Sequence, residues 1–282
     1  MKYVLWFSLL GLCFVCLIVA PSCSILGGPP RGVQLGADET GIGVLLVWET
    51  PVEGTPDEYL VFFRPRGDTV YEQIDKTTGS SSRHDPQGQT GDYRVDARFG
   101  VDTYQSAEMT TIPVHTPTTV LYERDAVGLF AFGWDSAGDG KAYDMLDTAN
   151  VDSVDFYITD FSSGSERIPY AIASPDMAPG DSGETVVAAG WRVVGFSDPI
   201  PHSLENDPLP GANTPTDTNY FNYTMIDSAP MLVAVHPLVD EQFALVRVEK
   251  VDPSIGEVRV ETWFQPVKRL RLISHEIDRV GF

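Results

Sequence analysis

The chain has 282 residues, which is enough for one large domain or two ordinary domains with their own cores. Hydrophobic residues make up 43% and charged residues 21%, a balance that excludes a disordered chain and an integral membrane bundle. The formal net charge of −21 repels phosphate backbones and argues against nucleic-acid binding. All three cysteines, Cys13, Cys16 and Cys23, precede residue 24, so disulfides are not expected in the rest of the chain.

The N-terminus has the pattern of a secretory signal peptide. One cation, Lys2, precedes an apolar run that ends at Ala20 and breaks at Pro21. A run of about 18 residues reaches the lower limit for a membrane-spanning helix, so a retained anchor is an alternative. The next cation is Arg31, and a basic stop-transfer flank is therefore missing. We expect residues 1–22 to be a signal peptide.

The sequence Ala20-Pro-Ser-Cys23 resembles the bacterial lipobox, although the family usually has Leu where Ala20 stands. The resemblance implies that Cys23 is lipidated and that residues 23–31 form a tether. It also implies that Ser24 favours transfer to an outer membrane, with plain secretion as the alternative. Loss of the leader removes one cation, Lys2, and takes the net charge from −21 to −22. Membrane attachment would then depend on the acyl chains, because the protein itself repels anionic lipid.

From Gly32 onward, short runs rich in Val, Thr, Tyr and Phe alternate with turn residues, and we therefore predict an all-β protein. The segment 112–117 contains two prolines, which do not continue a central strand. It predicts a boundary between one domain over residues 32–116 and a second over residues 117–282.

The first domain contains three strand patterns with aromatic residues at regular spacing. Trp48 ends an alternating run, Tyr59 begins another, and Tyr93 lies in the run Tyr-x-Val-x-Ala. This spacing resembles a fibronectin type III domain over the whole block. The resemblance implies an immunoglobulin-like sandwich with Trp48 between its sheets and Tyr93 at a tyrosine corner. Such a fold carries no chemistry of its own.

The second domain contains nine candidate strands, which predict a second, larger β-sandwich or jelly roll. They cover residues 120–123, 129–134, 154–159, 186–196, 220–226, 231–236, 243–248, 258–264 and 270–273.

The segment from Asp135 to Asp144 resembles the start of a calcium-binding loop. Asp135 and Asp139 occupy the first and fifth positions and Gly140 the sixth. The twelfth position, where a bidentate Glu is usual, holds Leu146. We name Asp135, Asp139 and Asp144 as candidate ligands of a structural Ca²⁺, with a solvated acidic hairpin as the alternative.

Two histidines, His202 and His236, lie far enough apart along the chain to converge in the fold. The C-terminal block also resembles HmuY-like β-sheet lipoproteins in its Gly133-Trp-Asp and Asp155-Phe-Tyr segments and in its last strand. The resemblance implies haem held between His202 and His236. An inert loop histidine is the alternative.

Two further patterns have weaker functional interpretations. The loop Gly180-Asp-Ser-Gly-Glu184 resembles the nucleophile loop of trypsin-like proteases, but a histidine in a matching context is missing, and we predict no enzyme. Aromatic residues of the second domain would form a sugar-stacking platform if exposed and a sandwich core if buried. They are Trp191, Tyr220, Phe221, Tyr223 and Trp263.

The sequence therefore predicts a non-catalytic, lipid-anchored protein of the cell envelope. In this interpretation the first domain is a spacer and the protein is an interaction or structural module. The alternative is capture of a glycan, a divalent cation or haem by the second domain.

Overall fold

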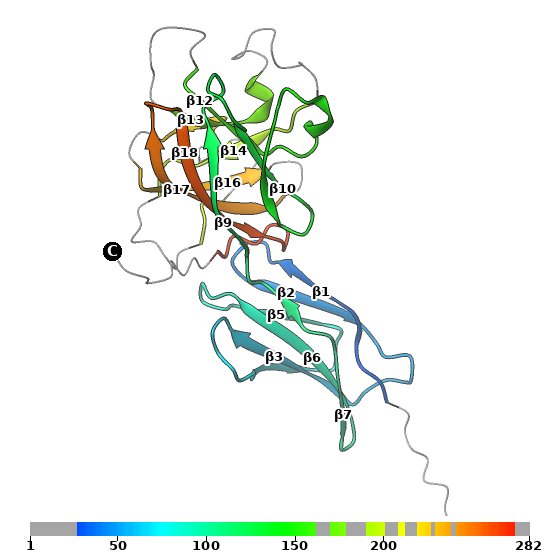
Figure 1. The fold of residues 1–282 in the computed structure, drawn as a ribbon. Coiled ribbons are helices and arrows are strands. Elements are labelled where there is room, and N and C mark those ends of the chain that lie inside the picture. The colour runs from blue at the N-terminus through cyan, green and yellow to red at the C-terminus, as the bar shows by residue number, and fades with distance from the viewer. Residues whose placement is uncertain are drawn as a thin grey trace, which may run out of the picture.

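The computed structural model describes residues 27–161, 170–178, 190–200, 208–211, 219–226, 229–237 and 241–273. In these residues the chain forms 18 strands and two 3-10 helices, Thr148–Asn150 and Pro175–Met177 (Figure 1). Every strand pairing is antiparallel. The all-β prediction is confirmed. No helix in the described part of the chain is long and apolar enough to cross a membrane.

The N-terminal strands form two sheets packed face to face. One sheet has three strands in the order β1-β2-β5, and the other has the order β4-β3-β6-β7, with β8 also paired to β6. The strands are β1 Arg31–Ala37, β2 Val44–Glu49, β3 Glu58–Pro65, β4 Glu72–Thr77, β5 Ser81–His84, β6 Gly91–Phe99, β7 Asp102–Gln105 and β8 Met109–Thr110. We call this unit the first sandwich.

Alternation along the strands builds the core of the first sandwich. In β2 the side chains of Val44, Leu46 and Trp48 are buried and their neighbours are exposed. Trp48 meets Tyr59 of the opposite sheet edge-on, with ring centroids 5.3 Å apart. Tyr93 is buried too, but its hydroxyl contacts Nδ1 of His84 at 2.9 Å. This partner is a side chain, where a tyrosine corner uses the backbone.

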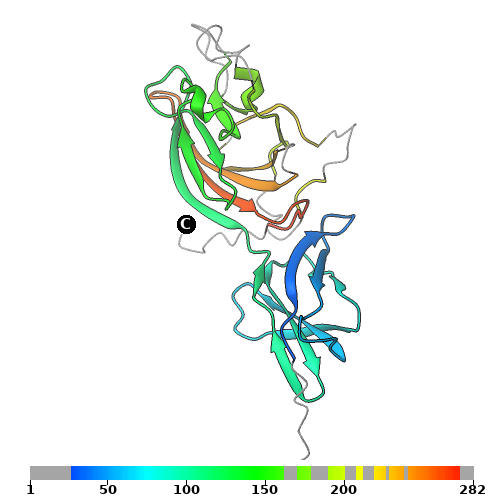
Figure 2. The ribbon, with the colours of Figure 1, turned by 90° about the vertical axis from the view of Figure 1, so that its right-hand side faces the viewer.

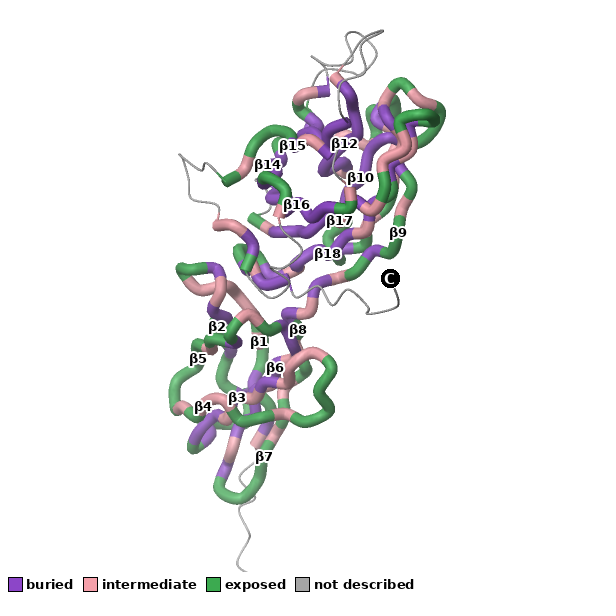
Figure 3. The backbone as a smooth tube through the Cα atoms, turned by 90° about the vertical axis from the view of Figure 1, so that its left-hand side faces the viewer, coloured by how far each residue is buried: buried purple, intermediate pink, exposed green. Residues whose placement is uncertain are grey.

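The second sandwich consists of two five-stranded sheets. One has the order β11-β10-β12-β13-β15 and the other β14-β16-β17-β18-β9. The strands are β9 Val114–Tyr122, β10 Ala131–Trp134, β11 Gly140–Tyr143, β12 Phe156–Thr159, β13 Ala171–Ala173, β14 Val194–Phe196, β15 Tyr223–Met225, β16 Met231–Pro237, β17 Phe243–Asp252 and β18 Glu257–Gln265. Figure 3 shows how much of these strands is buried.

Three features of the second sandwich differ from the predicted strands. Strands β11 and β13 were not predicted, and within the described part of the predicted run 186–196, residues 190–196, the strand β14 covers only 194–196, while residues 186–189 lie outside the described residues. Strand β9 begins at Val114, so the boundary between the sandwiches lies before Pro117. Pro117 fits within β9 because this strand is at the sheet edge and the pairing shifts register beside it.

The segment Gln265–Ile273, which we call the joint segment, connects the two sandwiches. Residues 270–273 were predicted as a strand, but Leu270 and Leu272 instead pack, with Val267, in the core cluster of the first sandwich. The backbone N–H of Arg271 donates to the carbonyl of Gly41 in the β1–β2 turn at 2.8 Å. Figure 2 shows this end of the second sandwich beside that turn. The first sandwich therefore depends on the C-terminal part of the chain for part of its core.

The described chain starts at the opposite end of the first sandwich. A side chain added at Gly27 would meet Phe99 and Tyr104, which lie on either side of the β6–β7 turn. At the other end of β6, the carbonyl of Gly91 accepts a hydrogen bond from the N–H of Thr111. Thr111 in turn contacts Gln265 of the joint segment. Nine residues of strand separate these ends, a length of about 30 Å. The start of the described chain at Gly27 and the second sandwich thus lie at opposite ends of the first sandwich (Figure 1).

Candidate functional site

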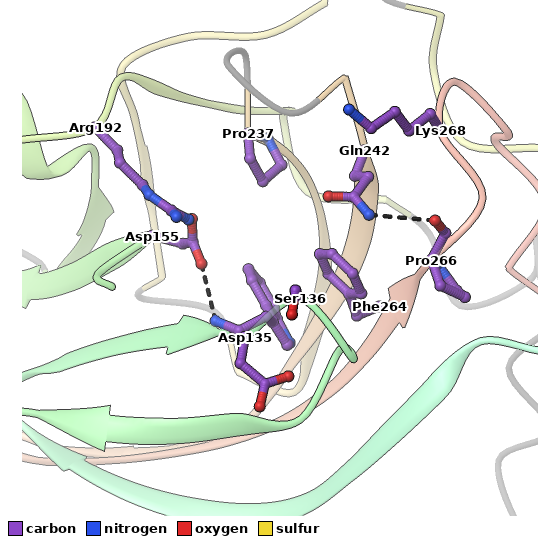
Figure 4. A pocket seen from close by; sticks show the side chains of 10 residues that line it. Asp135, Ser136, Asp155, Arg192, Pro237, Gln242, Phe264, Pro266 and Lys268 are labelled. Carbon is purple, nitrogen blue, oxygen red and sulfur yellow. Dashed lines mark hydrogen bonds and ion pairs between the residues drawn. The ribbon is translucent and has the colours of Figure 1, made fainter. Parts of the chain in front are cut away.

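A cavity of about 430 Å³ opens at the end of the second sandwich, beside the joint segment (Figure 4). The ends of strands from both sheets supply its walls, because β10, β16 and β18 all terminate here. The lining residues are Trp134, Asp135, Ser136, Asp155, Arg192, Pro237, Gln242, Phe264, Pro266 and Lys268.

The apolar part of the lining is held rigidly. The rings of Trp134 and Phe264 stack with centroids 5.6 Å apart. The indole N–H of Trp134 donates to the hydroxyl of Thr262 at 3.1 Å, so its polar edge is satisfied inside the core. These two rings present a fixed apolar surface to whatever enters the cavity.

The polar part of the lining is built around Asp155, whose side chain is almost fully buried. One carboxylate oxygen accepts the backbone N–H of Trp134 at 2.9 Å, and the other pairs with Nη1 of Arg192 at 2.8 Å. Burial of a carboxylate is tolerated when it is paired in this way, and removal of one partner of such a pair costs about 3–5 kcal/mol.

The outer wall of the cavity lies next to the joint segment. The side-chain amide of Gln242 donates to the carbonyl of Pro266 at 3.2 Å, while Lys268 is exposed. The lining thus combines stacked rings, an ion pair, an amide and a cation. Pockets that bind small molecules have this composition, with an apolar surface and a few fixed polar groups.

The opposite end of the second sandwich carries a cluster of carboxylates. Glu123 and Asp125 follow β9, and Asp160 follows β12. One carboxylate oxygen from each lies within 4.8 Å of the others. Burial, together with the charges of Asp160 and Asp125, raises the pKa of Glu123 to about 7. No sequence pattern predicted this cluster, since its members come from two loops that are distant along the chain.

The residues predicted as a calcium loop are engaged in turns. Oδ1 of Asp135 accepts the backbone N–H groups of Ala137 at 2.8 Å and of Asp139 at 3.0 Å. Oδ1 of Asp144 accepts the N–H of Leu146 at 2.8 Å. Among the residues described, Asp135, Asp139 and Asp144 are not brought together as a group that could hold a metal ion, whereas Glu123, Asp125 and Asp160 are. Short Asp side chains commonly cap turns in this way.

Of the two histidines predicted to hold haem, the structure describes only His236. His236 is buried on β16, its Nδ1 contacts the carbonyl of Gln242 at 2.7 Å, and its ring stacks on Phe243 with centroids 4.4 Å apart. His202 lies outside the described residues, as do the leader, Cys23 and the loop around Ser182.

The five aromatic residues do not form one exposed platform. Trp191 and Trp263 are buried in separate clusters on the outer faces of the two sheets, where loops cover them. Phe221 and Tyr223 are each 44% exposed. For both tryptophans the alternative of a buried core therefore applies, and they do not contribute to a sugar-stacking surface. Alternation along a strand cannot show whether loops cover its outer face.

These features define an all-β protein of two joined sandwiches, with a cavity at one end of the second. No family model matches the sequence, and no curated protein matches it. Among solved structures, 20 chains match. One is the crystal structure of a DUF4466 family protein from Parabacteroides merdae ATCC 43184, with a TM-score of 0.40 and 11% identity, covering 79% of this chain and 91% of that chain. A likeness at this level carries no conclusion about function.

Proposed function

We propose that this chain is a non-catalytic, lipid-anchored protein of the cell envelope, in which the first sandwich is a spacer and the second sandwich contacts a partner. Cys23 is the attachment point to the membrane in this proposal. The two sheets of the first sandwich, with the strand orders β1-β2-β5 and β4-β3-β6-β7, and its buried Trp48 support the resemblance to a fibronectin type III domain.

One observation carries the spacer role, namely that the start of the described chain at Gly27 and the second sandwich lie at opposite ends of the first sandwich. The joint segment makes the connection stiff, because Val267, Leu270 and Leu272 are buried in the core of the first sandwich. A flexible linker would let the second sandwich fold back on the membrane, whereas a packed joint holds it about one strand length away.

The anchor is tested by metabolic labelling. We expect the full chain, expressed in a bacterial host fed an alkyne-tagged fatty acid, to incorporate the label and to fractionate with membranes. Replacement of Cys23 by Ala should abolish both, while the same replacement at Cys16 should leave lipidation intact. Label retained by the Cys23→Ala variant, or absent from the wild-type chain, would contradict the lipid anchor.

A second candidate function is capture of a small ligand, and the cavity beside the joint segment favours it. Its stacked Trp134 and Phe264 rings fit a planar or apolar group, and Lys268 suits a negatively charged one. A screen of glycans and small aromatic acids by thermal shift tests this function. A hit should be lost in Ser136→Trp, which fills the cavity from an exposed turn, and kept in Ser254→Trp on a distant turn.

A further inference from the structure

We propose that Glu123, Asp125 and Asp160 bind one calcium ion at the end of the second sandwich that faces away from the first. Val114, at the start of β9, pairs with Phe264 beside the joint segment, and Tyr122, at its end, pairs with Glu257. Glu123 follows directly, so the cluster lies a full strand length from the cavity. This site is independent of the lipid anchor and of ligand capture.

The spacing of the three carboxylates fits one ion. One oxygen from each lies within 4.8 Å of the others. Calcium binds oxygens at 2.3–2.6 Å, and two ligands on opposite sides of the same ion are therefore about 5 Å apart. All three side chains can touch a single calcium ion without a change in the backbone.

A buried oxygen atom of Glu123 provides the second observation. The residue is only 5% exposed, and its Oε2 accepts the backbone N–H of Asp125 at 2.8 Å. Its Oε1 is also buried and has no hydrogen-bond partner among the described residues. An unsatisfied buried acceptor of this kind is costly, and two further carboxylates beside it add repulsion. A cation in the cluster removes both costs.

The positive charge of Arg124 offsets only part of the negative charge of the three carboxylates. Its guanidinium pairs with both oxygens of Asp125, at 3.1 Å and 3.0 Å. The side chain of Asp125 is 58% exposed and that of Arg124 is 6% exposed, so solvent screens this pair on the Asp125 side, where the carboxylate is also open to a metal ion. This pairing engages Asp125 and leaves Oε1 of Glu123 without a hydrogen-bond partner among the described residues.

The backbone around the cluster is fixed without an ion. The N–H of Glu123 donates to the carbonyl of Gly256 at 2.7 Å, and the N–H of Arg124 donates to the carbonyl of Ile158 at 3.1 Å. Glu123 follows a strand of one sheet and Asp160 a strand of the other. A bound ion would therefore clamp the two sheets together at this end. Three carboxylates, of which only that of Asp125 is exposed, match the small number of protein ligands in the weak calcium sites of extracellular modules, with Kd of about 10⁻⁴–10⁻³ M.

Calorimetric titration of CaCl₂ into the chelator-treated full chain tests the proposal. We expect one site, with affinity reduced at least tenfold in Glu123→Gln and in Asp160→Asn. The matched control is Asp139→Asn, which alters the predicted calcium loop and should leave the affinity unchanged. No binding to the wild-type chain, or equal loss in Asp139→Asn and Glu123→Gln, would overturn the proposal. So would MgCl₂ binding as tightly as CaCl₂.

Thermal unfolding separates loss of the site from loss of the fold. Calcium should raise the Tm of the wild-type chain and of Asp139→Asn, but not that of Glu123→Gln. Without calcium, Glu123→Gln should unfold at or above the wild-type Tm, because the amide removes a buried negative charge and can donate to a neighbouring carboxylate. A calcium-dependent rise in Tm in Glu123→Gln equal to that of the wild-type chain would contradict the site.

Discussion

The side-chain amide of Gln265 donates to the backbone carbonyl of Thr111 at 3.0 Å, and this bond links the last strand of the second sandwich to the segment that leaves the first. The same amide donates to the carbonyl of Leu272 at 2.7 Å, and its oxygen accepts the N–H of Val267. Gln265 is fully buried. One side chain thus holds both chain segments that pass between the sandwiches.

Replacement of Gln265 by Leu should destabilise the protein. The change leaves the carbonyls of Thr111 and Leu272 without this donor, and a buried unsatisfied group costs about 1–3 kcal/mol. Urea unfolding measures the loss as a lower midpoint. Gln73→Leu on exposed β4 is the matched control and should leave the midpoint within error. Equal midpoints for Gln265→Leu and the control would show that the amide does not hold the joint.

Truncation of Leu272 should weaken the first sandwich, although the residue follows the last strand of the second. Leu272 is 1% exposed within the core cluster of the first sandwich, and Leu→Ala at such a site costs about 2–5 kcal/mol. Scanning calorimetry should show that a transition assigned to the first sandwich moves to lower temperature. Leu146→Ala, at a 58% exposed position, is the control. An unchanged thermogram for Leu272→Ala would argue against the shared core.

His84 should make the first sandwich less stable in acid. Burial lowers the pKa of His84 below its usual 6.5, so the unfolded chain binds the proton more tightly than the folded one. Its contribution to stability is complete above pH 6.5 and is lost as the pH falls through the lowered pKa of the folded state. In His84→Gln, urea midpoints between pH 8 and pH 5 should fall less than in the wild-type chain. Parallel pH profiles would contradict this role.

Glu123 should have the opposite pH dependence. Its pKa in the folded protein is raised to about 7 from a usual 4.5, so the folded state binds the proton more tightly. In chelator, the stability that this group contributes is present below pH 4.5 and is lost as the pH rises to about 7. Glu123→Gln should remove this part of the pH profile. If the stability profiles of the wild-type chain and of Glu123→Gln differ by a constant at all pH values, this contribution of Glu123 is ruled out.

Sequence patterns were sufficient to predict the position of a strand where that strand buries one face and exposes the other. The alternating residues of β2 and β3 and the position of β6 are of this kind, and each lies where predicted. The run Leu270–Ile273 has an equally apolar pattern, but its packing partner is a different sandwich, and local sequence carries no information about such a partner.

The candidate sites were less predictable because each depends on contacts between distant segments. Asp135 and Asp139 match the spacing of a calcium loop, yet Oδ1 of Asp135 accepts hydrogen bonds from backbone N–H groups within the same turn. Glu123 and Asp160 match no spacing rule, because two sheets must pack before their loops meet. Trp263 lies on an outer sheet face that becomes buried only when loops cover it.

The distance between the two sandwiches in solution tests the central claim most directly. After Cys13, Cys16 and Cys23 are replaced by Ser, the full chain contains no cysteine, and Thr103→Cys and Ile255→Cys place one exposed spin label on each sandwich. A packed joint predicts one narrow distance distribution by pulsed electron paramagnetic resonance, and Gln265→Leu should broaden it. A broad or multiple distribution in the chain with Gln265 intact would contradict a stiff spacer.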